Sequence, residues 1–330
     1  MKSLDRYLLV LAACVCFFAI YILFVGSSFL SEGVASTSLA KIVRPEKKIS
    51  QPVEIILTGD VMLGRTVMTT SLDLNDPVYP FRKVADTLRS ADIVFANLEN
   101  PIIKNCPRHT DGFKFCADPR MVEGLTFSGI DVVNLANNHT LNYGKEGLEE
   151  TKNFLTSSKI DYVGVGNLVT KEVEGNTFGF LGFDMVDNQL SKGNLELIKT
   201  SDTKVDVLIV GVHWGTEYTQ KASEIQREWA NLIIENGADV IVGHHPHWVQ
   251  EIEYISQQNT TGANLNHPTG GVVAAPVVYY SLGNFVFDQM WSQKTREGLA
   301  IRLTFRDSEL IGEEKLPTYM TSWAQPEFVR

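Results

Sequence analysis

Histidines, carboxylates and carboxamides gather in short stretches of this 330-residue chain, and each stretch follows a segment that the residue pattern predicts to be a β-strand. Nitrogen and oxygen ligands gathered at strand ends, with no thiolate among them, favour a hard or borderline divalent metal ion. The pattern therefore predicts a site for one or two ions of Mn, Mg, Zn or Fe. The stretches are Thr58–Arg65, Asn97–Glu99, Asn137–His139, His213–Glu217 and Gly243–His247.

The last stretch gives the strongest signal, because His244, His245 and His247 follow a predicted strand directly. Buried imidazoles are costly to desolvate and are hard to justify as packing alone. Neutral imidazole is a common metal ligand, and a His-x-His spacing can present two rings to one ion. The stretch therefore predicts binding of a metal or of a phosphate-like anion.

The other motifs each have a purely structural interpretation as well, and the residues alone leave both interpretations open. A turn residue often hydrogen-bonds its own backbone, and a lone histidine is usually a satisfied core residue. The structural interpretations are a turn cap for Asp60, an exposed loop acid for Glu99, turn residues for Asn138 and His139, a core histidine for His213 and a turn-shaping amide for Asn284.

Strand-like apolar runs alternate with helical patterns along the chain, which is typical of an α/β domain with crossover connections. Ligands bind at the carboxyl ends of strands in such sheets, so one rim can gather all of the polar stretches. The predicted strands are Val53–Leu57, Ile93–Ala96, Val132–Leu135, Tyr162–Val165, Phe178–Phe183, Val205–Val212, Val240–Val242, Val277–Tyr280 and Leu299–Phe305. The predicted helices are Phe81–Arg89, one opened by Asp118 and Pro119, Glu146–Leu155 and Ser223–Asn236, and a surface loop is predicted from Gln257 to Pro276.

The chain is acidic, with a formal net charge of −10 at pH 7. A nucleic-acid-binding surface would need a basic face, so this charge argues against a nucleic-acid partner. It also makes binding of an anionic polymer harder unless a metal or a local basic patch supplies positive charge.

The N-terminus carries an uncharged run of 19 residues, Tyr7–Val25, which is long enough to cross a bilayer as a helix. Lys2 and Arg6 precede it, so the positive-inside tendency places residues 1–6 in the cytoplasm. The sequence thus predicts a single-pass anchor at residues 7–25, a tether at 26–52 and an extracytoplasmic domain at 53–330. A cleavable signal peptide is the alternative, with small residues at Val25–Ser28.

Two cysteines, Cys106 and Cys116, lie ten residues apart in a polar stretch. Outside the cytoplasm such a pair can close a loop with a disulfide, whereas two unrelated thiols are the alternative. Sequence alone leaves both possibilities open, because it does not supply the Cα separation that decides between them.

Taken in order, the motifs resemble the CapA-type family of poly-γ-glutamate capsule-biosynthesis proteins. The resemblance extends from about Glu54 to Phe305 and rests on the set rather than on any single motif. It implies a relative of the calcineurin-like metallophosphoesterases, with a four-layer α/β/β/α sandwich and a dinuclear metal centre. The motifs are Thr58–Arg65, Asn97–Pro101, Leu135–His139, Gly211–Tyr218, Gly243–Gln250 and Tyr280–Phe287.

The resemblance also assigns expected roles to individual residues. Asp60 would bind one metal, Glu99 would be the bridging carboxylate and Asn138 would be a further ligand. His213 and two of the three late histidines, His244, His245 and His247, would complete the set of ligands. His-x-His spacing favours His245 and His247, whereas the Gly-His order favours His244. The residues expected to be catalytic are His139 as general acid, Arg65 and Asp60, and those expected to contact substrate are Arg65, Asn97, Asn137, Trp214, Glu217 and Asn284.

Two positions depart from the family pattern. Typical phosphoesterases begin with Asp-x-His, but here the third position is Met62, which is a poor ligand for a hard metal. Many CapA-type proteins carry Asp where this chain has Asn142, so a charge near the site is missing. These departures weaken the expectation of two full metal positions.

The leading functional hypothesis is a membrane-anchored protein that assists synthesis, export or processing of poly-γ-glutamate or a similar anionic polymer. The resemblance implies membrane-embedded polymer-synthase or export subunits as partners at the cell membrane. If the chain is an enzyme, the expected reaction is metal-dependent hydrolysis or transfer at an amide or phosphoester. The alternatives are an extracytoplasmic metal-dependent phosphoesterase and a non-catalytic scaffold of a capsule-assembly complex.

Overall fold

The computed structural model describes residues 51–255 and 276–329 of the chain. The predicted transmembrane segment at 7–25, almost all of the predicted tether and nearly all of the loop predicted at Gln257–Pro276 lie outside these residues. Ser50–Arg330 forms one compact unit. Within the two described ranges, no helix has both the length and the apolar character needed to cross a membrane.

Two β-sheets dominate the described part of the chain. In the first sheet β1 to β4 run parallel, and β12 to β14 extend it antiparallel on the other side of β1. In order, its strands are β14 (Gln325–Phe328), β13 (Glu309–Ser322), β12 (Glu297–Arg306), β1 (Val53–Val61), β2 (Ile93–Leu98), β3 (Val132–Asn134) and β4 (Asp161–Val163), with β11 (Asn284–Val286) paired to the end of β1. The second sheet has the order β5 (Val169–Val173), β6 (Asn176–Asp184), β7 (Val207–His213), β8 (Val240–His244), β10 (Val277–Tyr279) and β9 (Ile252–Tyr254).

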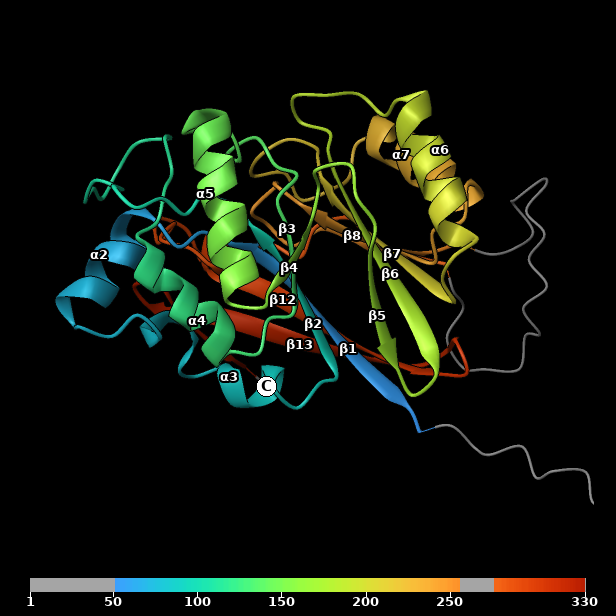
Figure 1. The fold of residues 1–330 in the computed structure, drawn as a ribbon, viewed down its shortest axis with the longest axis horizontal. Coiled ribbons are helices and arrows are strands. Elements are labelled where there is room, and N and C mark those ends of the chain that lie inside the picture. Colours follow the sequence, from blue (N-terminus) through green and yellow to red (C-terminus); the bar gives the residue numbers. More distant parts are fainter. Residues whose placement is uncertain (1–50, 256–275, 330) are drawn as a thin grey trace, which may run out of the picture. The chain divides into compact units, whose positions relative to one another are not determined.

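The helices connect these strands and cover the outer faces of the sheets. Figure 1 shows α4 and α5 grouped apart from α6 and α7. The α-helices are α2 (Arg65–Asp73), α3 (Ala85–Leu88), α4 (Val122–Phe127), α5 (Gly144–Ser157), α6 (Lys192–Asp202), α7 (Glu224–Glu235) and α8 (Gln293–Arg296), and the 3₁₀ helices are η1 (Tyr79–Phe81) and η2 (Pro119–Met121). Both α6 and α7 begin at a serine capping box, which satisfies backbone N–H groups that a helix start leaves free.

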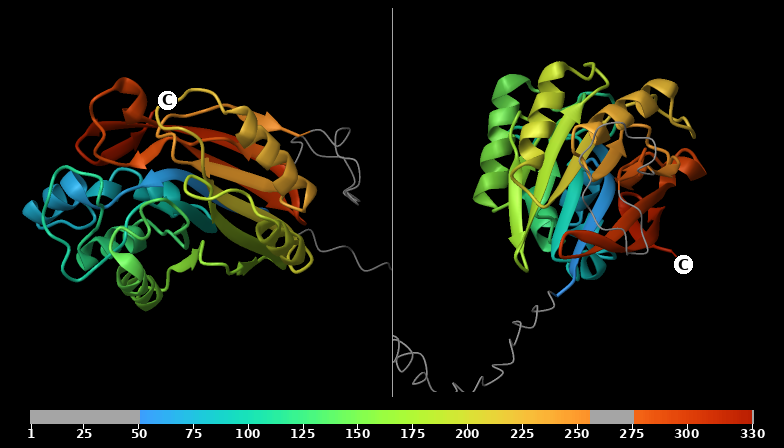
Figure 2. Two further views of the ribbon diagram at one scale, coloured as in Figure 1. Left: turned by 90° about the horizontal axis from the view of Figure 1, so that it is seen from above. Right: turned by 90° about the vertical axis from the view of Figure 1, so that its right-hand side faces the viewer.

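Three hydrophobic cores separate four layers of structure. Successive side chains of a strand point to opposite faces, so β1 places Ile56 in the core under α2 to α5 and Leu57 in the core between the sheets. In the second sheet, Ile209 of β7 faces the first sheet, whereas Leu208 packs with α6 and α7. The order is therefore helices, sheet, sheet, helices, and Figure 2 shows the two sheets from two further directions.

All nine predicted strands are present in the structure, although most of them begin or end one or more residues away from the predicted bounds. The sequence analysis missed α2, α6, α8 and the strands β5, β9, β11, β13 and β14. The long strand β13 has a mostly exposed or half-exposed pattern, so it lacks the apolar run by which a buried strand is recognised. The helix predicted at Phe81–Arg89 was wrong in part, because only Ala85–Leu88 is α-helical and η1 ends at Phe81.

One close backbone approach brings β11 to the polar end of β1. A Cβ atom on Gly59 would lie 2.1 Å from the carbonyl oxygen of Gly283, so only glycine fits at this crossing. The backbone N–H of Asp60 then donates to the Gly283 carbonyl at 2.9 Å, and Asp60 pairs with Asn284 in register. The fold thereby places Asn284 beside Asp60, more than two hundred residues away in the sequence.

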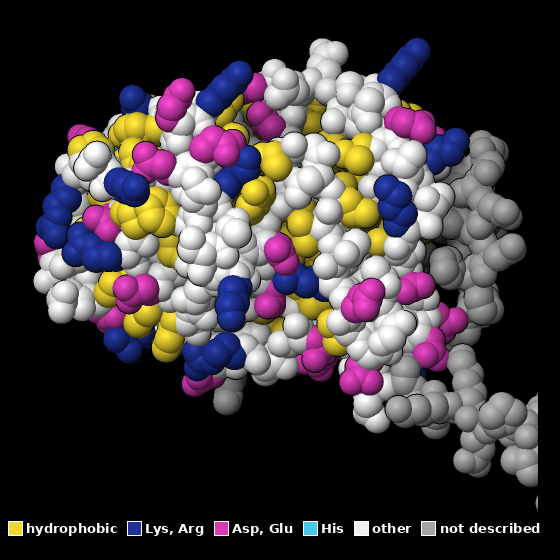
Figure 3. Space-filling model, viewed as in Figure 1, with side chains coloured by type: hydrophobic (Ala, Val, Ile, Leu, Met, Phe, Trp, Pro, Cys, Tyr) yellow, Lys and Arg dark blue, Asp and Glu magenta, His cyan; other side chains and the backbone are white. Residues whose placement is uncertain are grey.

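Surface and core agree with the composition. On the face drawn in Figure 3, acidic and basic side chains of the described residues are intermingled rather than segregated into a basic patch.

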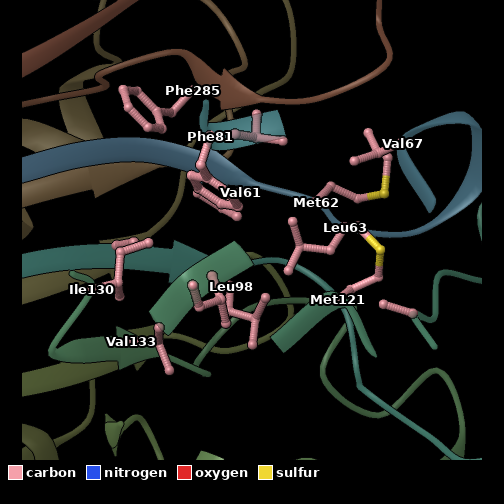
Figure 4. Packing of buried hydrophobic residues seen from close by; sticks show 14 of the residues in the cluster. Val61, Met62, Leu63, Val67, Phe81, Leu98, Met121, Ile130, Val133 and Phe285 are labelled. Carbon is pink, nitrogen blue, oxygen red and sulfur yellow. The ribbon is translucent and has the colours of Figure 1, made fainter. Parts of the chain in front are cut away.

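Figure 4 shows part of the core under α2 to α5, with Met62 close to Leu63 and Val67. Met62 is fully buried, and its sulfur accepts a hydrogen bond from the backbone of Gly64 at 3.1 Å. The side chain at the departure from Asp-x-His is thus a core residue.

Candidate metal centre

Asp60 lies at the end of β1 and is fully buried. Its Oδ1 accepts a hydrogen bond from Asn97 at 2.9 Å, and its Oδ2 accepts one from the backbone N–H of His245 at 3.3 Å. The Nδ1 atom of His247 lies 3.1 Å from the same Oδ2. Burial opposes ionisation of this carboxyl, but the hydrogen bonds from His247 and Asn97 and the electrostatic influence of His247 and His244 together outweigh burial and lower the pKa of Asp60. Asp60 is therefore a carboxylate held by groups from both sheets.

Glu99 follows β2 and is fully buried beside Asp60. Neither of its carboxylate oxygens has a hydrogen-bond partner among the described residues. Its Oε1 lies 3.6 Å from Nε2 of His247 and 3.9 Å from Nε2 of His139. Burial, together with the negative charges of Asp60 and Glu217, raises the pKa of Glu99 well above its ordinary value. A buried carboxylate in this position is costly unless a cation satisfies it, so the residues fit a metal ion.

Two groups of ligand atoms lie side by side in the structure. The first consists of Asp60, Glu99 and His247, and the second of Glu217, His245 and His247. Within each group the ligand atoms lie within 4.8 Å of one another, and His247 belongs to both. Carboxylate and imidazole groups in this arrangement suit the ions expected from the sequence, with one or two positions. Glu217, which the sequence suggested as a substrate contact, is thus placed among the candidate ligands.

The backbone at the late histidines is strained in a way that serves this arrangement. His245 has a φ angle of 96° and His247 one of 57°, a region that side chains other than glycine rarely adopt. Such strain persists only where the surrounding structure holds it, and it concentrates at functional sites.

The Nδ1 atom of His247 lies between Oδ2 of Asp60 and Oδ1 of Asn284, at 3.1 and 3.0 Å. With Nδ1 as the donor to these two acceptors, Nε2 is left as the ligand atom.

A chain of buried carboxamides runs behind the carboxylates. Asn134 donates to Oδ1 of Asn97 at 3.2 Å, so the amide of Asn97 turns its N–H groups toward Asp60 and toward Nδ1 of His213, which lies 3.3 Å away. The other ring nitrogen of His213 lies 3.0 Å from Oδ1 of Asn138. Burial lowers the pKa of His213 well below its ordinary value. His213 and Asn138 therefore lie together at the site, joined by a hydrogen bond.

His139 is held on two sides. Its Nδ1 lies 3.1 Å from Oδ1 of Asn142, and its ring stacks on Phe115 with 3.9 Å between the ring centroids. The same Asn142 oxygen accepts the backbone N–H of Phe115 at 2.6 Å. Donation from Nδ1 leaves Nε2 facing Glu99, and burial lowers the pKa of His139 to about 4. The imidazole is thus neutral at pH 7, with its free lone pair directed into the site.

The loop that carries Phe115 is closed by a disulfide between Cys106 and Cys116, whose Cα atoms lie 5.8 Å apart. This confirms the bridge that the sequence left open. The two cysteines also lie near His109, but bridged cysteines offer no thiolate, so this group is not a metal site.

Arg65 forms a buried ion pair with Asp288, and its Nη1 donates to the carbonyl of Gly112 in the disulfide loop at 2.9 Å. Its guanidinium lies 4.6 Å from the ring centroid of Phe115. Arg65 thus makes a bidentate contact with a carboxylate of the chain itself, so the guanidinium that was expected to contact substrate is already paired.

Two of the predicted site residues, His244 and Trp214, lie away from the two groups of candidate ligand atoms. The Nε2 atom of His244 lies 3.0 Å from the carbonyl oxygen of Thr58, and its fully buried ring contacts Phe95 between the sheets. His245 and His247, rather than His244, belong to the two candidate groups of ligand atoms. Trp214 is also fully buried; it packs with α6 and α7, stacks on Tyr280 and donates to the Tyr280 carbonyl at 2.9 Å. It has no surface to offer a substrate, so that expectation was wrong.

Other predicted substrate contacts lie behind the ligands. The amide of Asn137 donates to the carbonyl of Leu98 and accepts the backbone N–H of His139, so it shapes the turn before that histidine. Asn97 and Asn284 are buried and orient Asp60 and His247. Sequence reasoning missed Asn134 and Asp288. For Asn134 the available signal was a polar residue inside a buried strand, whereas Asp288 comes after β11, a strand that the sequence did not predict.

Comparison with known proteins identifies what this chain is similar to. The family model described as bacterial capsule synthesis protein PGA_cap matches residues 54–289. The capsule biosynthesis protein CapA of Bacillus anthracis is 30% identical over 288 residues, which cover 78% of this chain and 65% of that protein. The PGA biosynthesis protein CapA of Bacillus subtilis (strain 168) is 30% identical over 312 residues, which cover 87% of this chain and 75% of that protein.

Solved structures give more remote likenesses. A hypothetical protein from Thermus thermophilus has a TM-score of 0.49 and 15% identity, covering 80% of this chain and 98% of that one. A 5'-nucleotidase from Candida albicans has a TM-score of 0.39 and 12% identity, covering 80% of this chain and 50% of that one. Neither likeness is close enough to carry an argument about this site.

Proposed function

The chain belongs to the PGA_cap family of bacterial capsule synthesis proteins, and from that premise we propose that it assists synthesis, export or processing of poly-γ-glutamate through a divalent metal centre. A similar anionic polymer fits the same proposal. The names of the two Bacillus relatives, which refer to capsule and to PGA biosynthesis, support the choice of polymer. A bound cation would supply the positive charge that this acidic chain otherwise lacks for an anionic substrate.

The observation that carries the metal centre is Glu99. Its two oxygens are buried without partners among the described residues, within reach of His247 and beside the ionised Asp60. Negative groups do not stay together in a buried site unless a proton or a cation joins them. The proposed ligands are Asp60, Glu99, Glu217, His245 and His247.

When bound, the ion would act as a Lewis acid on the substrate and would neutralise developing negative charge. The chain supplies the proton chemistry. His139 is neutral at pH 7, and Asn142 fixes the tautomer in which Nε2 faces the site. This nitrogen can accept a proton and return it to the leaving group, the behaviour of a general acid and base. The expected reaction is hydrolysis or transfer at an amide or phosphoester.

A second candidate function is phosphoester hydrolysis. The observation that favours it is the pair of ligand groups that share His247, because two neighbouring ion positions suit the clamping of a phosphoester. We also propose that the layered sheets are of the metallophosphoesterase type. The order of helices, sheet, sheet and helices supports that assignment.

The location of the chain is part of the proposal. We propose that residues 7–25 anchor it in the cell membrane, with the domain from residue 53 outside and membrane-embedded synthase or export subunits as neighbours. The uncharged run Tyr7–Val25 after Lys2 and Arg6 supports this arrangement. The disulfide between Cys106 and Cys116 supports an oxidising location for the domain.

The test is turnover by the full-length chain with Mn²⁺ added. Poly-γ-glutamate length is followed by gel filtration, and p-nitrophenyl phosphate is assayed in parallel. We expect the polymer to shorten, and we expect His139→Ala to lower the rate about 100-fold or more while an exposed-acid control, Glu228→Gln, leaves it unchanged. Turnover of the phosphoester alone would favour the second candidate. No turnover of either substrate would contradict both and would leave the scaffold hypothesis.

A further inference from the structure

A pocket of about 570 Å³ opens beside the candidate metal centre, between the disulfide loop and the segment that follows β11. Its floor contains the paired Arg65 and Asp288. Phe113, Trp291 and Trp323 stand around it with 80%, 61% and 52% of their surfaces exposed. Across residues 51–255 and 276–329, these are the only phenylalanine and tryptophan side chains with such exposure. Exposed aromatic groups gathered at one pocket mark a binding surface rather than chance.

The charges of the pocket disfavour a polyanion as its occupant. Arg65 is committed to Asp288, and the backbone N–H of Thr66 donates to the same carboxylate at 3.1 Å. The remaining charged residue in the described lining is Asp111, which is exposed. A carboxylate-rich polymer would therefore find no uncommitted cation in this lining, so the pocket suits a neutral group.

Neutral polar groups line the pocket together with the aromatic ones. The hydroxyl of Thr66 donates to the Thr110 carbonyl at 3.4 Å, and the amide of Gln289 donates to the hydroxyl of Tyr218 at 3.1 Å. The ring of Tyr218 meets Trp291 edge to face, with 4.9 Å between the centroids. A sugar ring presents an apolar C–H face, which packs on an aromatic face, and a rim of hydroxyls, which pairs with such groups.

The pocket is connected to the metal groups through direct contacts. The ring centroid of Tyr218 lies 6.0 Å from that of His247. Phe287, which precedes Asp288, lies 4.9 Å from His247 by the same measure. Gln289 also accepts a hydrogen bond from Asn284, the residue that orients His247. A ligand in the pocket would thus present its attached group to the candidate metal centre.

We propose that this pocket is a saccharide subsite, which binds a neutral sugar unit of a second substrate and holds it beside the candidate metal centre, separately from the poly-γ-glutamate of the proposed function. The proposal deepens the proposed function by naming a second chemical class at the same site. It rests on that function only for the link to the metal, because binding of the sugar needs neither an ion nor turnover.

The test is calorimetric titration of the full-length chain, held in a detergent without a sugar headgroup. The probes are tetrasaccharides of β-1,4-linked N-acetylglucosamine, β-1,4-linked glucose and α-1,4-linked glucose. We expect at least one to bind, and we expect Trp291→Ala and Trp323→Ala each to weaken binding about fivefold to tenfold. Trp323→Tyr should retain most of the affinity because it keeps an aromatic face. Ile225→Ala, at an exposed apolar residue on α7 that is not in the pocket lining, should change nothing.

Two further arms separate this proposal from its rivals and from the metal centre. EDTA and Glu99→Gln should leave saccharide binding intact, so loss of metal chemistry and loss of the sugar site are distinguishable. A proline-rich decapeptide and an oligo-γ-glutamate are titrated in parallel. The proposal is overturned if no saccharide binds, or if saccharide affinity is unchanged in both Trp291→Ala and Trp323→Ala. It is also overturned if these substitutions weaken binding only of the peptide or of the anionic oligomer.

Discussion

The ring of Phe115 stacks on the ring of His139, with 3.9 Å between their centroids. Phe115 belongs to the loop that the Cys106–Cys116 disulfide closes, and His139 follows a different strand. A covalent constraint in one loop therefore positions a side chain of the candidate site, and Asn142 completes the link by accepting N–H groups from both residues.

We expect loss of this disulfide to lower both stability and turnover without removing the metal. Cys106→Ser with Cys116→Ser should reduce the free energy of unfolding by about 2 to 3 kcal/mol, because a short closed loop restricts the unfolded chain. Urea unfolding measures the stability, the assay with Mn²⁺ measures turnover, and metal analysis shows whether the ion is retained. Adding a reductant to the double variant is the control and should have no further effect. Unchanged turnover in the double variant would show that the loop does not position His139.

The substitution Asn142→Asp should raise the pKa of His139 above its wild-type value of about 4. The new carboxylate would accept the same two N–H groups but would add negative charge, which stabilises the imidazolium. The pH at which His139 loses its proton should therefore move upward, and NMR titration of the His139 ring protons measures it. Asn153→Asp on the exposed side of α5 is the matched control. An unmoved titration would mean that Asn142 does not govern this ring.

Glu99→Gln should have opposite effects on the metal-free and metal-loaded chain. Without metal it removes a carboxyl group whose raised pKa opposes folding at pH 7, and it should stabilise the fold by about 1 to 3 kcal/mol. With Mn²⁺ at 100 times its dissociation constant, the wild type should gain about 2.7 kcal/mol and the variant should gain much less. Thermal unfolding with and without Mn²⁺ measures both the stability of the metal-free protein and its gain in stability on binding the ion. Equal responses of the two proteins to Mn²⁺ would argue against Glu99 as a ligand, and Glu228→Gln is the exposed-acid control.

Gly243→Ala should destabilise the chain where β8 leads into the late histidines. The added Cβ atom would lie 2.0 Å from the Tyr280 carbonyl oxygen, so backbone must move, at a cost of about 1 to 3 kcal/mol. Gly193→Ala in α6 meets only the Ser191 hydroxyl, at 3.6 Å, and should be neutral or stabilising. Urea unfolding of both variants checks the difference, and equal midpoints would refute the packing argument.

The sequence indicated residues that the structure gathers at one rim, but it missed the strands β5, β9 and β14 at the edges of the two sheets. Asp60, Glu99, His245 and His247 follow continuous apolar strands, and strand ends in a parallel sheet converge on one rim. Spacing alone could not show which of His244, His245 and His247 face the candidate site. Their directions depend on the positive φ angles of His245 and His247.

Other features depended on contacts between distant segments. Trp214 directly follows His213, the last residue of β7, but His213 faces the site and Trp214 faces α6 and α7. The pairing of Arg65 with Asp288 joins residues 223 positions apart, which no local pattern encodes. The strand β13 was missed because its pairing with β12, rather than an apolar run, holds it in place.

The most direct test of the metal centre is the metal content of the full-length chain after equilibration with Mn²⁺ and gel filtration, measured by mass spectrometry of the elements. The wild type should retain one or two ions per chain, and a variant with His245→Ala and His247→Ala should retain far less while keeping its folded circular dichroism spectrum. Equal metal in the two proteins, or no metal in the wild type, would contradict the assignment of a metal site to Asp60, Glu99 and the late histidines.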